Sequence, residues 1–408
     1  MRSSLRADWV LPIAGPPIEG GSVTIEDGRI VAVEPVAPPG ATNLGRRVLM
    51  PGLVNAHTHL ELSYLHARIP RAACFTDWVR PLLAARRTPP DQETVEAHAA
   101  DAIDEAVESG TVLFGDVSNG LAGLSALRRS RMAAHVFYEL LGFNAPEPDA
   151  RVAEARARID VEHQAAERDG LEIRFSLAPH APYSVSPALF DGIRRDATAH
   201  GSPTTVHLAE GQEEVRLLAD GTGPWRALLE TLGVWTDTWK APACSPVAYL
   251  QQRGFLNGST LVVHGVQCTA DDIARLRHVG ATVVACPRSN AYVGAGEPPL
   301  ADFYAAGVPV AFGTDSLASV EDLNLFRELA EARRVAPAVP ARRLLESATL
   351  TGARALGFER DYGSLEPGKR AALVSVGVPS GVTDVEEYLL SGLTTEMRCE
   401  MPFPPAQA

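Results

Sequence analysis

Lysine is nearly absent from this chain: Lys240 and Lys369 are the only two among 37 basic residues. Basic residues form no cluster beyond short pairs such as Arg86-Arg87, and the net charge is −13. Because nucleic acids bind to basic surfaces, this composition argues against a nucleic acid partner. It favours a small-molecule substrate instead.

Cysteine is also scarce, with five residues and no C-x-x-C pair. That pattern argues against a disulfide framework and against a thiolate zinc site, so any metal should take nitrogen and oxygen ligands. The chain has no uncharged apolar stretch of about 18 residues, the length expected of a membrane span. Its first residues, MRSSLRADW, lack the apolar core of a secretory signal. We therefore expect a cytoplasmic protein with no membrane partner.

Eight runs of β-branched and other apolar residues alternate with segments of helical period. These runs are residues 48–57, 111–118, 133–141, 172–180, 203–210, 259–266, 281–289 and 308–316. Parallel strands are buried on both faces and need helical crossovers, so the repeat predicts an α/β fold, a closed (β/α)8 TIM-type barrel. An open doubly wound sheet is the alternative, although no G-x-G-x-x-G follows a first strand.

The two ends of the chain have a different pattern. Residues 21–35, GSVTIEDGRIVAVEP, alternate apolar and polar positions around the turn dipeptide Asp27-Gly28, which predicts a β-hairpin. Strand-like alternation returns in YGSLEPGKRAALVSVGV near the C-terminus. We predict a small β-sandwich domain built from residues 1–48 and 359–408, with the barrel, residues 49–358, inserted between them.

A long connection, residues 221–258, separates the fifth and sixth predicted strands and contains Trp225, Trp235 and Trp239. Long connections inside compact domains are often lids or binding loops. Simple packing of these tryptophans onto the barrel is the alternative, and the sequence leaves both open.

Two histidines, His57 and His59, lie one residue apart in PGLVNAHTHLELS, and on a strand both imidazoles would project to the same side. His207, His264 and Asp315 each lie at the end of a later run. Active sites of such barrels lie at the carboxyl ends of the strands. Three of these four histidines together with the carboxylate would form a site for one divalent metal ion, Zn²⁺ first, with Fe²⁺ and Mn²⁺ also acceptable. Each residue also has a structural alternative, a core histidine or a helix cap.

The segments PGLVNAHTHLELS, VHLAE, VVHGV, CPRSN and GTDS, with the late PGKRAALVSV, resemble the amidohydrolase superfamily over about residues 20–378. The similarity is to its branch of mononuclear metal-dependent deaminases. It implies four metal ligands: His57, His59, His207 and Asp315. It also implies that Glu210 passes a proton to the substrate ring and that His264 orients the metal-bound water.

Under this interpretation, hydroxide formed at the metal attacks the amidine carbon of an aminated purine-type heterocycle, and ammonia leaves. Asp315 accepts the proton of the water, His264 stabilises the oxygen of the tetrahedral intermediate, and Glu210 protonates the ring nitrogen. Binuclear members of the superfamily bridge their metals with a carboxylated lysine from a mid-barrel strand. Neither Lys240 nor Lys369 lies on a predicted barrel strand, so a single metal is predicted.

HTHLE, APHAP and CPRSN resemble bacterial enzymes that deaminate 6-aminodeoxyfutalosine for menaquinone biosynthesis. This resemblance implies that Glu61 and His180 contact the ribose. It also implies that Arg288, Ser289 and Asn290 line the pocket, with an arginine available for the benzoate of the substrate. A structural salt bridge is the alternative role for Arg288.

Several questions stay open at this point. Glu139, in the third run, has no clear role from sequence. Competing substrates are adenosine, S-adenosylhomocysteine and methylthioadenosine, followed by guanine and triazine-type rings, the latter for a chlorohydrolase or amidase. A metal-free scaffold protein is the alternative from another functional class. The sequence does not fix the oligomeric state, and a homodimer is compatible with it.

Overall fold

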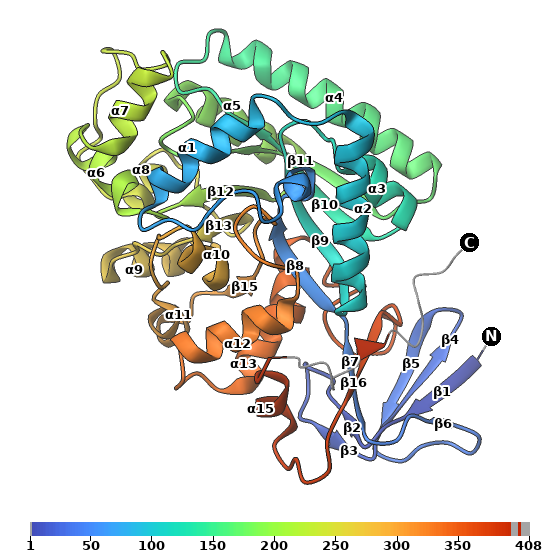
Figure 1. Cartoon of the computed structure of the whole chain (residues 1–408). Coiled ribbons are helices and arrows are strands. Elements are labelled where there is room, and N and C mark those ends of the chain that lie inside the picture. Colours follow the sequence, from blue (N-terminus) through green and yellow to red (C-terminus); the bar gives the residue numbers. More distant parts are fainter. Residues whose placement is uncertain (1, 393–398, 401–408) are drawn as a thin grey trace.

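The computed structural model describes residues 2–392 and 399–400, and a ring of eight parallel strands dominates it (Figure 1). Each half of the ring is a four-stranded sheet, with the orders β11-β10-β9-β8 and β12-β13-β14-β15. The amide of His207 donates to the carbonyl of His180 (2.9 Å), and that of Asp315 to the carbonyl of His57 (3.1 Å), which joins the two halves. The predicted (β/α)8 barrel is therefore confirmed. Its strands are β8 (Leu53–Thr58), β9 (Thr111–Ser118), β10 (Ala133–Leu140), β11 (Ile173–Pro179), β12 (Thr204–Leu208), β13 (Thr260–His264), β14 (Thr282–Ala285) and β15 (Val310–Phe312).

Helices surround this ring (Figure 1). As predicted, the helix Ala270–Val279 begins with a capping box between Thr269 and Asp272 and ends at Gly280, a left-handed residue (φ 73°). Within the described residues, no helix combines the length and apolar character needed to cross a membrane. The helices are η1 (Leu60–Leu65), α1 (Phe75–Arg86), α2 (Gln92–Glu108), α3 (Leu124–Ser130), α4 (Pro148–Arg168), α5 (Pro187–His200), α6 (Gln212–Asp220), α7 (Pro224–Thr231), α8 (Pro246–Gln252), α9 (Ala270–Val279), α10 (Pro287–Tyr292), α11 (Leu300–Ala306), α12 (Leu325–Val335), α13 (Ala341–Glu346), η2 (Ser347–Thr351), α14 (Gly352–Ala355) and α15 (Val385–Leu389).

The first apolar run, residues 48–57, is two strands, so the prediction of one continuous strand there was wrong. β7 (Arg47–Pro51) belongs to the small sheet, whereas β8 pairs with β9 in the barrel. Between them, a Cβ on Gly52 would lie only 2.2 Å from Cγ1 of Val112, so the chain crosses from one sheet to the other at a residue without a side chain. Both strands are buried, and their apolar pattern is therefore continuous.

Both ends of the chain contribute to a small unit of two packed sheets, as the β-sandwich prediction required. In Figure 1 this unit lies beside the amino-terminal end of β8. One sheet has the order β5-β4-β1-β6 and the other β17-β16-β7-β2-β3. The hairpin around Asp27-Gly28 is confirmed, because β4 and β5 are antiparallel and both turn residues have positive φ (48° and 74°). The domain limits at residues 48 and 358 stay a prediction. The strands are β1 (Arg2–Arg6), β2 (Trp9–Val10), β3 (Ile18–Glu19), β4 (Ser22–Glu26), β5 (Arg29–Glu34), β6 (Thr42–Asn43), β7, β16 (Leu373–Gly377) and β17 (Cys399–Glu400).

A second hydrophobic core lies among the segments that follow the barrel strands, including α1, α6 and α7. The ring of Trp225 stacks on that of Tyr183, with 3.9 Å between centroids. Trp235 and Trp239 both pack against Phe143, with centroid distances of 5.6 Å. The tryptophans of the 221–258 connection are therefore packed onto the loops at this end of the barrel, which agrees with the packing alternative.

Candidate metal and catalytic site

His57, His59, His207 and Asp315 converge at the carboxyl end of the barrel. Nε2 of His59 lies 3.3 Å from Nε2 of His207, and Oδ1 of Asp315 lies 3.5 Å from Nε2 of His59 and 3.7 Å from Nε2 of His57. One ring nitrogen from each of the three histidines falls within 4.8 Å of the others. The structure thus brings together the four side chains predicted to be metal ligands.

The GTDS segment places Asp315 by a close approach of two strands. A Cβ on Gly313 would lie 2.6 Å from Cβ of His57, so β15 and β8 come this near only because residue 313 is glycine. Asp315 follows with a left-handed backbone (φ 62°), which Asp tolerates better than most residues. Its Oδ1 accepts a hydrogen bond from the amide of Ser316 at 2.8 Å.

The donor set fits a cation. Both ring nitrogens of His57 are buried without a hydrogen-bond partner among the described residues, and His57 itself has 0% of its surface exposed. Burial lowers the pKa of His57 to about 4 and also lowers that of His59, so both rings are neutral and carry a free lone pair at pH 7. Buried lone pairs that face one another are costly unless an ion satisfies them. The arrangement matches an N₃O ligand set.

Glu139, which the sequence left ambiguous, lies behind one of these ligands. It is 4% exposed at the end of β10, and its Oε1 lies 3.4 Å from Nδ1 of His207. The same Nδ1 lies 3.2 Å from the carbonyl oxygen of His180. Burial acts to lower the pKa of His207, but the hydrogen bond and charge of Glu139 raise it overall. Two acceptors at Nδ1 fix the proton there and leave Nε2 free to bind a metal.

Glu210 and His264 form a second pair beside the metal ligands. Nε2 of His264 lies 3.5 Å from Oε1 of Glu210, and Nδ1 of His264 donates to Oδ1 of Asn290 at 2.8 Å. Burial, and after it the charge of Asp315, raises the pKa of Glu210 well above its usual value. Burial holds the pKa of His264 well below its usual value. At neutral pH the imidazole is therefore neutral, and burial favours the protonated form of Glu210.

Glu214 is a buried carboxyl group that sequence reasoning missed. Its Oε2 accepts a hydrogen bond from the amide of Glu210 (3.1 Å), and burial raises its pKa to about 8. It lies four residues after Glu210, within the first turn of α6, and is fully buried. The only signal in the sequence was a second acidic residue one helical turn further on. This hydrogen bond holds the backbone of Glu210 in place.

The carboxylate of Glu61 is hydrogen-bonded to the loop after β9, and the ribose contact predicted for Glu61 and His180 stays a prediction. The Glu61 carboxylate accepts hydrogen bonds from Oγ of Ser118 (2.6 Å) and from the amides of Asn119 (2.8 Å) and Gly120 (2.9 Å). These contacts order the loop after β9. His180, by contrast, lies beside the site, with its ring centroid 4.9 Å from that of His207.

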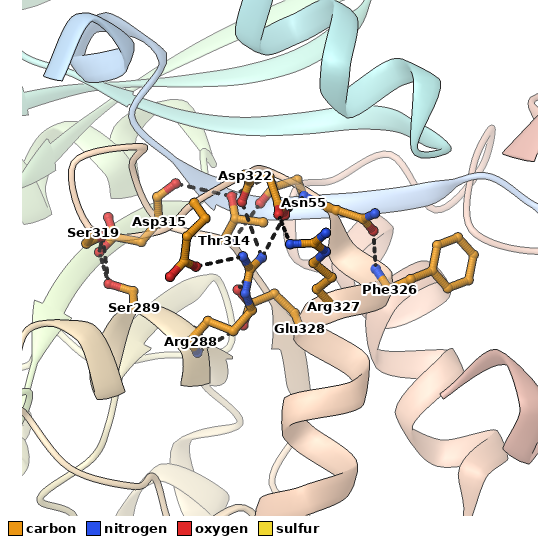
Figure 2. Close-up of polar contacts among 12 residues, drawn as sticks. Asn55, Arg288, Ser289, Thr314, Asp315, Ser319, Asp322, Phe326, Arg327 and Glu328 are labelled. Atoms are coloured by element: carbon orange, nitrogen blue, oxygen red, sulfur yellow. Dashed lines mark hydrogen bonds and ion pairs between the residues drawn. The ribbon is translucent and has the colours of Figure 1, made fainter. Parts of the chain in front are cut away.

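Arg288 lies in a network of ion pairs, which agrees with the structural alternative for this residue (Figure 2). Its Nη1 lies 3.0 Å from Oδ1 of Asp322 and 3.6 Å from Oε1 of Glu328. Its Nη2 lies 3.2 Å from Oε2 of Glu321. Three carboxylates thus surround the guanidinium that was expected to meet the substrate.

Ser289 and Asn290 contact the predicted catalytic side chains directly. Oγ of Ser289 donates to Oδ2 of Asp315 at 2.6 Å, next to Ser319, which donates to the same oxygen at 3.1 Å (Figure 2). Asn290 accepts from His264, as described above. The structure therefore places both residues as supports of Asp315 and His264. The lining role predicted for them stays a prediction.

Comparison with known proteins identifies the family of this chain. Residues 48–388 match the family described as the Amidohydrolase family. A 5-methylthioadenosine/S-adenosylhomocysteine deaminase from Moorella thermoacetica is 30% identical over 384 residues, which cover 90% of this chain and 83% of the relative. An aminodeoxyfutalosine deaminase from Deinococcus radiodurans is 33% identical over 328 residues, covering 78% and 76%. The solved structure of an adenosine deaminase from Xanthomonas campestris with bound zinc has a TM-score of 0.78 at 28% identity, covering 95% of this chain and 88% of that one.

Proposed function

We propose that this chain, which belongs to the amidohydrolase family, is a metal-dependent deaminase that hydrolyses the exocyclic C–N bond of an adenine-type nucleoside. One observation carries the proposal: the buried Glu210, whose pKa is raised, and a neutral His264 lie 3.5 Å apart, beside the four convergent ligands. Deamination needs an acid for the ring and a base for water: Glu210 would be the acid and Asp315 the base, while His264 orients the water. The deaminase names of the two relatives support the same reaction.

His57, His59, His207 and Asp315 would hold one divalent cation. Zinc is the first candidate, supported by the nitrogen-rich ligands and by the zinc in the Xanthomonas structure, with Fe²⁺ and Mn²⁺ as alternatives. When bound, such an ion acts as a Lewis acid that lowers the pKa of a water molecule toward 7.

Different side chains of the protein carry out the separate steps of proton transfer and water positioning. Glu210 donates its proton to the ring nitrogen next to the amino-bearing carbon, which makes that carbon electrophilic. The lone pair of Nε2 of His264 orients the attacking water, because Nδ1 is committed to Asn290. Asp315 accepts a proton from that water. The amino group then takes up the proton held by Asp315 and leaves as ammonia. The remaining hydroxyl proton passes to Glu210 as the ring carbon becomes a carbonyl, so both side chains return to their starting protonation states.

For the substrate, we propose 6-aminodeoxyfutalosine, supported by the similarity to the Deinococcus deaminase. S-adenosylhomocysteine and methylthioadenosine are the second candidates, supported by the longer match to the Moorella deaminase. Both proposals place an adenine amino group at the metal. They differ in what the sugar carries at its 5′ position.

An ammonia-release assay with purified, zinc-loaded protein tests this function. The panel contains 6-aminodeoxyfutalosine, S-adenosylhomocysteine, methylthioadenosine, adenosine and guanine, and release from the first at the highest kcat/KM is the expected result. Asp315→Asn should abolish turnover while the circular dichroism spectrum stays that of the wild type. Metal-loaded wild type without activity on any of these compounds would refute the proposal and favour a scaffold role.

A further inference from the structure

We propose that Asn55 is a positioning residue that fixes the proposed metal ligand Asp315 relative to His57, across the junction between the first and last strands of the barrel. This inference rests on the metal-dependent function proposed above and deepens it. It follows from a buried side chain that makes, at this junction, the hydrogen bonds that strand pairing makes elsewhere in the ring.

The junction between β8 and β15 has little backbone pairing. β8 forms a ladder with β9, and β15 with β14, but no ladder joins β8 to β15 in the described part of the chain. Among those residues a single backbone hydrogen bond crosses the junction, from the amide of Asp315 to the carbonyl of His57. Ladders between neighbouring strands hold the strand ends of a barrel in register. His57 and Asp315 therefore face each other at a place where that support is largely missing.

Asn55 bridges this junction with both ends of its amide group. Its Oδ1 accepts a hydrogen bond from the amide of Thr314 at 3.1 Å, and its Nδ2 donates to Oγ1 of Thr314 at 2.8 Å (Figure 2). Both residues have 0% of their surface exposed. A buried amide N–H needs an acceptor, and here a side-chain carbonyl takes the place that a backbone carbonyl has in a ladder. The pair therefore ties β8 to the segment that follows β15.

The bridge continues to the backbone of Asp315. Oγ1 of Thr314, which accepts from Asn55, donates to the carbonyl of Asp315 at 3.1 Å, and Oγ1 of Thr58 donates to the same carbonyl at 3.2 Å. Asp315 has a left-handed backbone (φ 62°), a conformation that costs free energy in a residue other than glycine and persists where the surrounding contacts enforce it. Asn55 thus acts on the Asp315 carboxylate through Thr314.

His57 lies on the other side of the junction, two residues after Asn55 on β8. The bridge therefore fixes both ligands in one frame. A displacement of either strand would change the distance between Nε2 of His57 and Oδ1 of Asp315, which is 3.7 Å. Zinc holds such ligands at about 2.0–2.2 Å and tolerates deviations of about 0.2 Å. Loss of the bridge should therefore lower the affinity for the metal.

The experiment measures zinc affinity, by competition with a chromophoric chelator, in the wild type, Asn55→Ala, Thr314→Val and Thr314→Ser. Asn55→Ala should lower the affinity by about 10- to 100-fold, the usual effect of losing a residue that orients a ligand. Thr314→Val removes only the hydroxyl and should act in the same direction but less. Thr314→Ser keeps the hydroxyl and should bind zinc as the wild type does. The absorption spectrum of Co²⁺-loaded Asn55→Ala should differ from that of the wild type, because it reports the arrangement of the ligands.

Thr204→Val is the matched control. Thr204 is buried at the other junction of the ring, between β11 and β12, where its hydroxyl donates to the carbonyl of Leu177 at 2.9 Å. The chemical change is the same as in Thr314→Val, but about 10 Å of strand separates it from His207. Urea denaturation of the metal-free proteins should show a loss of stability in both valine variants. Zinc affinity should fall only in Thr314→Val.

A folded Asn55→Ala with the zinc affinity and cobalt spectrum of the wild type would overturn this inference and leave the deaminase proposal intact. An equal loss of zinc affinity in Thr204→Val and Thr314→Val would also overturn it, because general loosening of the barrel would then explain the effect. If Asn55→Ala does not fold, the three threonine variants decide. A wild type that binds no zinc would overturn both proposals. If the wild type binds zinc but deaminates nothing, and the variants weaken zinc as expected, the positioning role is supported and the proposed function fails.

Discussion

Nδ1 of His207 lies 3.4 Å from a carboxylate oxygen of Glu139, while Nε2 of the same ring lies 3.3 Å from Nε2 of His59. One imidazole thus has a buried anion behind it and the metal-binding cluster in front. The anion decides which nitrogen carries the proton and orients the ring. Glu139 is in turn held by Asn119, at 2.8 Å. The metal site therefore depends on residues that do not bind the metal.

Glu139→Gln should lower the affinity for zinc by about 10- to 100-fold, the usual cost of losing a partner of this kind. Glutamine keeps the shape of the side chain, but an amide attracts the Nδ1 proton less than a carboxylate does. Competition with a chromophoric chelator measures the affinity directly. Glu162→Gln is the matched control, because Glu162 pairs with Arg128 on the outer helices. Equal affinity in the wild type and Glu139→Gln would show that Glu139 does not position His207.

The pH dependence of kcat should follow the ionisation of Glu210. Burial raises its pKa in the folded protein well above 4.5, so the protonated form, which is the proposed acid, persists to a higher pH than in a free glutamate. Activity should fall as the pH rises through that raised pKa, because the proton needed by the ring is lost. Glu210→Gln should lower kcat by about 10²- to 10⁴-fold. If Glu210→Gln keeps the kcat of the wild type and the same decrease of kcat at high pH, a group other than Glu210 donates the proton.

The free energy of unfolding should fall as the pH rises, because Asp116 ionises more readily in the unfolded than in the folded protein. Its side chain is 1% exposed and accepts the amide of Leu60 at 2.8 Å, and burial raises its pKa from 3.8 to about 7. Because the folded pKa is the higher one, the stabilising contribution is fully present below about pH 3.8 and is lost as the pH rises to about 7.

Asp116→Asn removes this ionisation while keeping an acceptor for Leu60. The free energy of unfolding of Asp116→Asn, relative to the wild type, should therefore increase between pH 5 and pH 8 by an amount on the order of a few kcal/mol. Urea denaturation at the two pH values measures it. Asp101→Asn, at an exposed position of α2, provides the control. A difference that does not change with pH would mean that Asp116 is ionised throughout.

The strand-end residues could be predicted because one rule covers them. His57, His207, His264 and Asp315 each end a buried apolar run, and parallel barrel strands bring all their carboxyl ends to one mouth. No long-range detail was needed. The break at Gly52 could not be predicted in the same way, because β7 and β8 are both largely buried and their residues form one run. The two strands differ in the strands that they pair with, and not in their periodicity.

Side-chain contacts that depend on loop conformation could not be predicted. Glu61 lies two residues after His59, yet its carboxylate turns to a loop that is 57–59 residues further along the chain. Arg288 lies in the CPRSN segment beside two residues that do reach the site, and its own side chain turns to Asp322 and Glu328. In both cases the motif locates the backbone, while neighbours distant in sequence decide the direction of the side chain.

The Ser289→Ala variant distinguishes whether Ser289 positions Asp315 or contacts the substrate. Ser289 donates to Oδ2 of Asp315 at 2.6 Å, and this oxygen receives a second hydrogen bond, from Ser319 at 3.1 Å. Loss of one of these two donors should let the Asp315 carboxylate rotate, which affects the proton transfer more than substrate binding. We therefore expect kcat to fall about 10-fold with KM nearly unchanged, and Ser319→Ala to act in the same direction but less, since its hydrogen bond is longer. Steady-state kinetics on the best substrate gives both parameters. A raised KM with an unchanged kcat would instead assign Ser289 to the substrate, as the sequence motif first suggested.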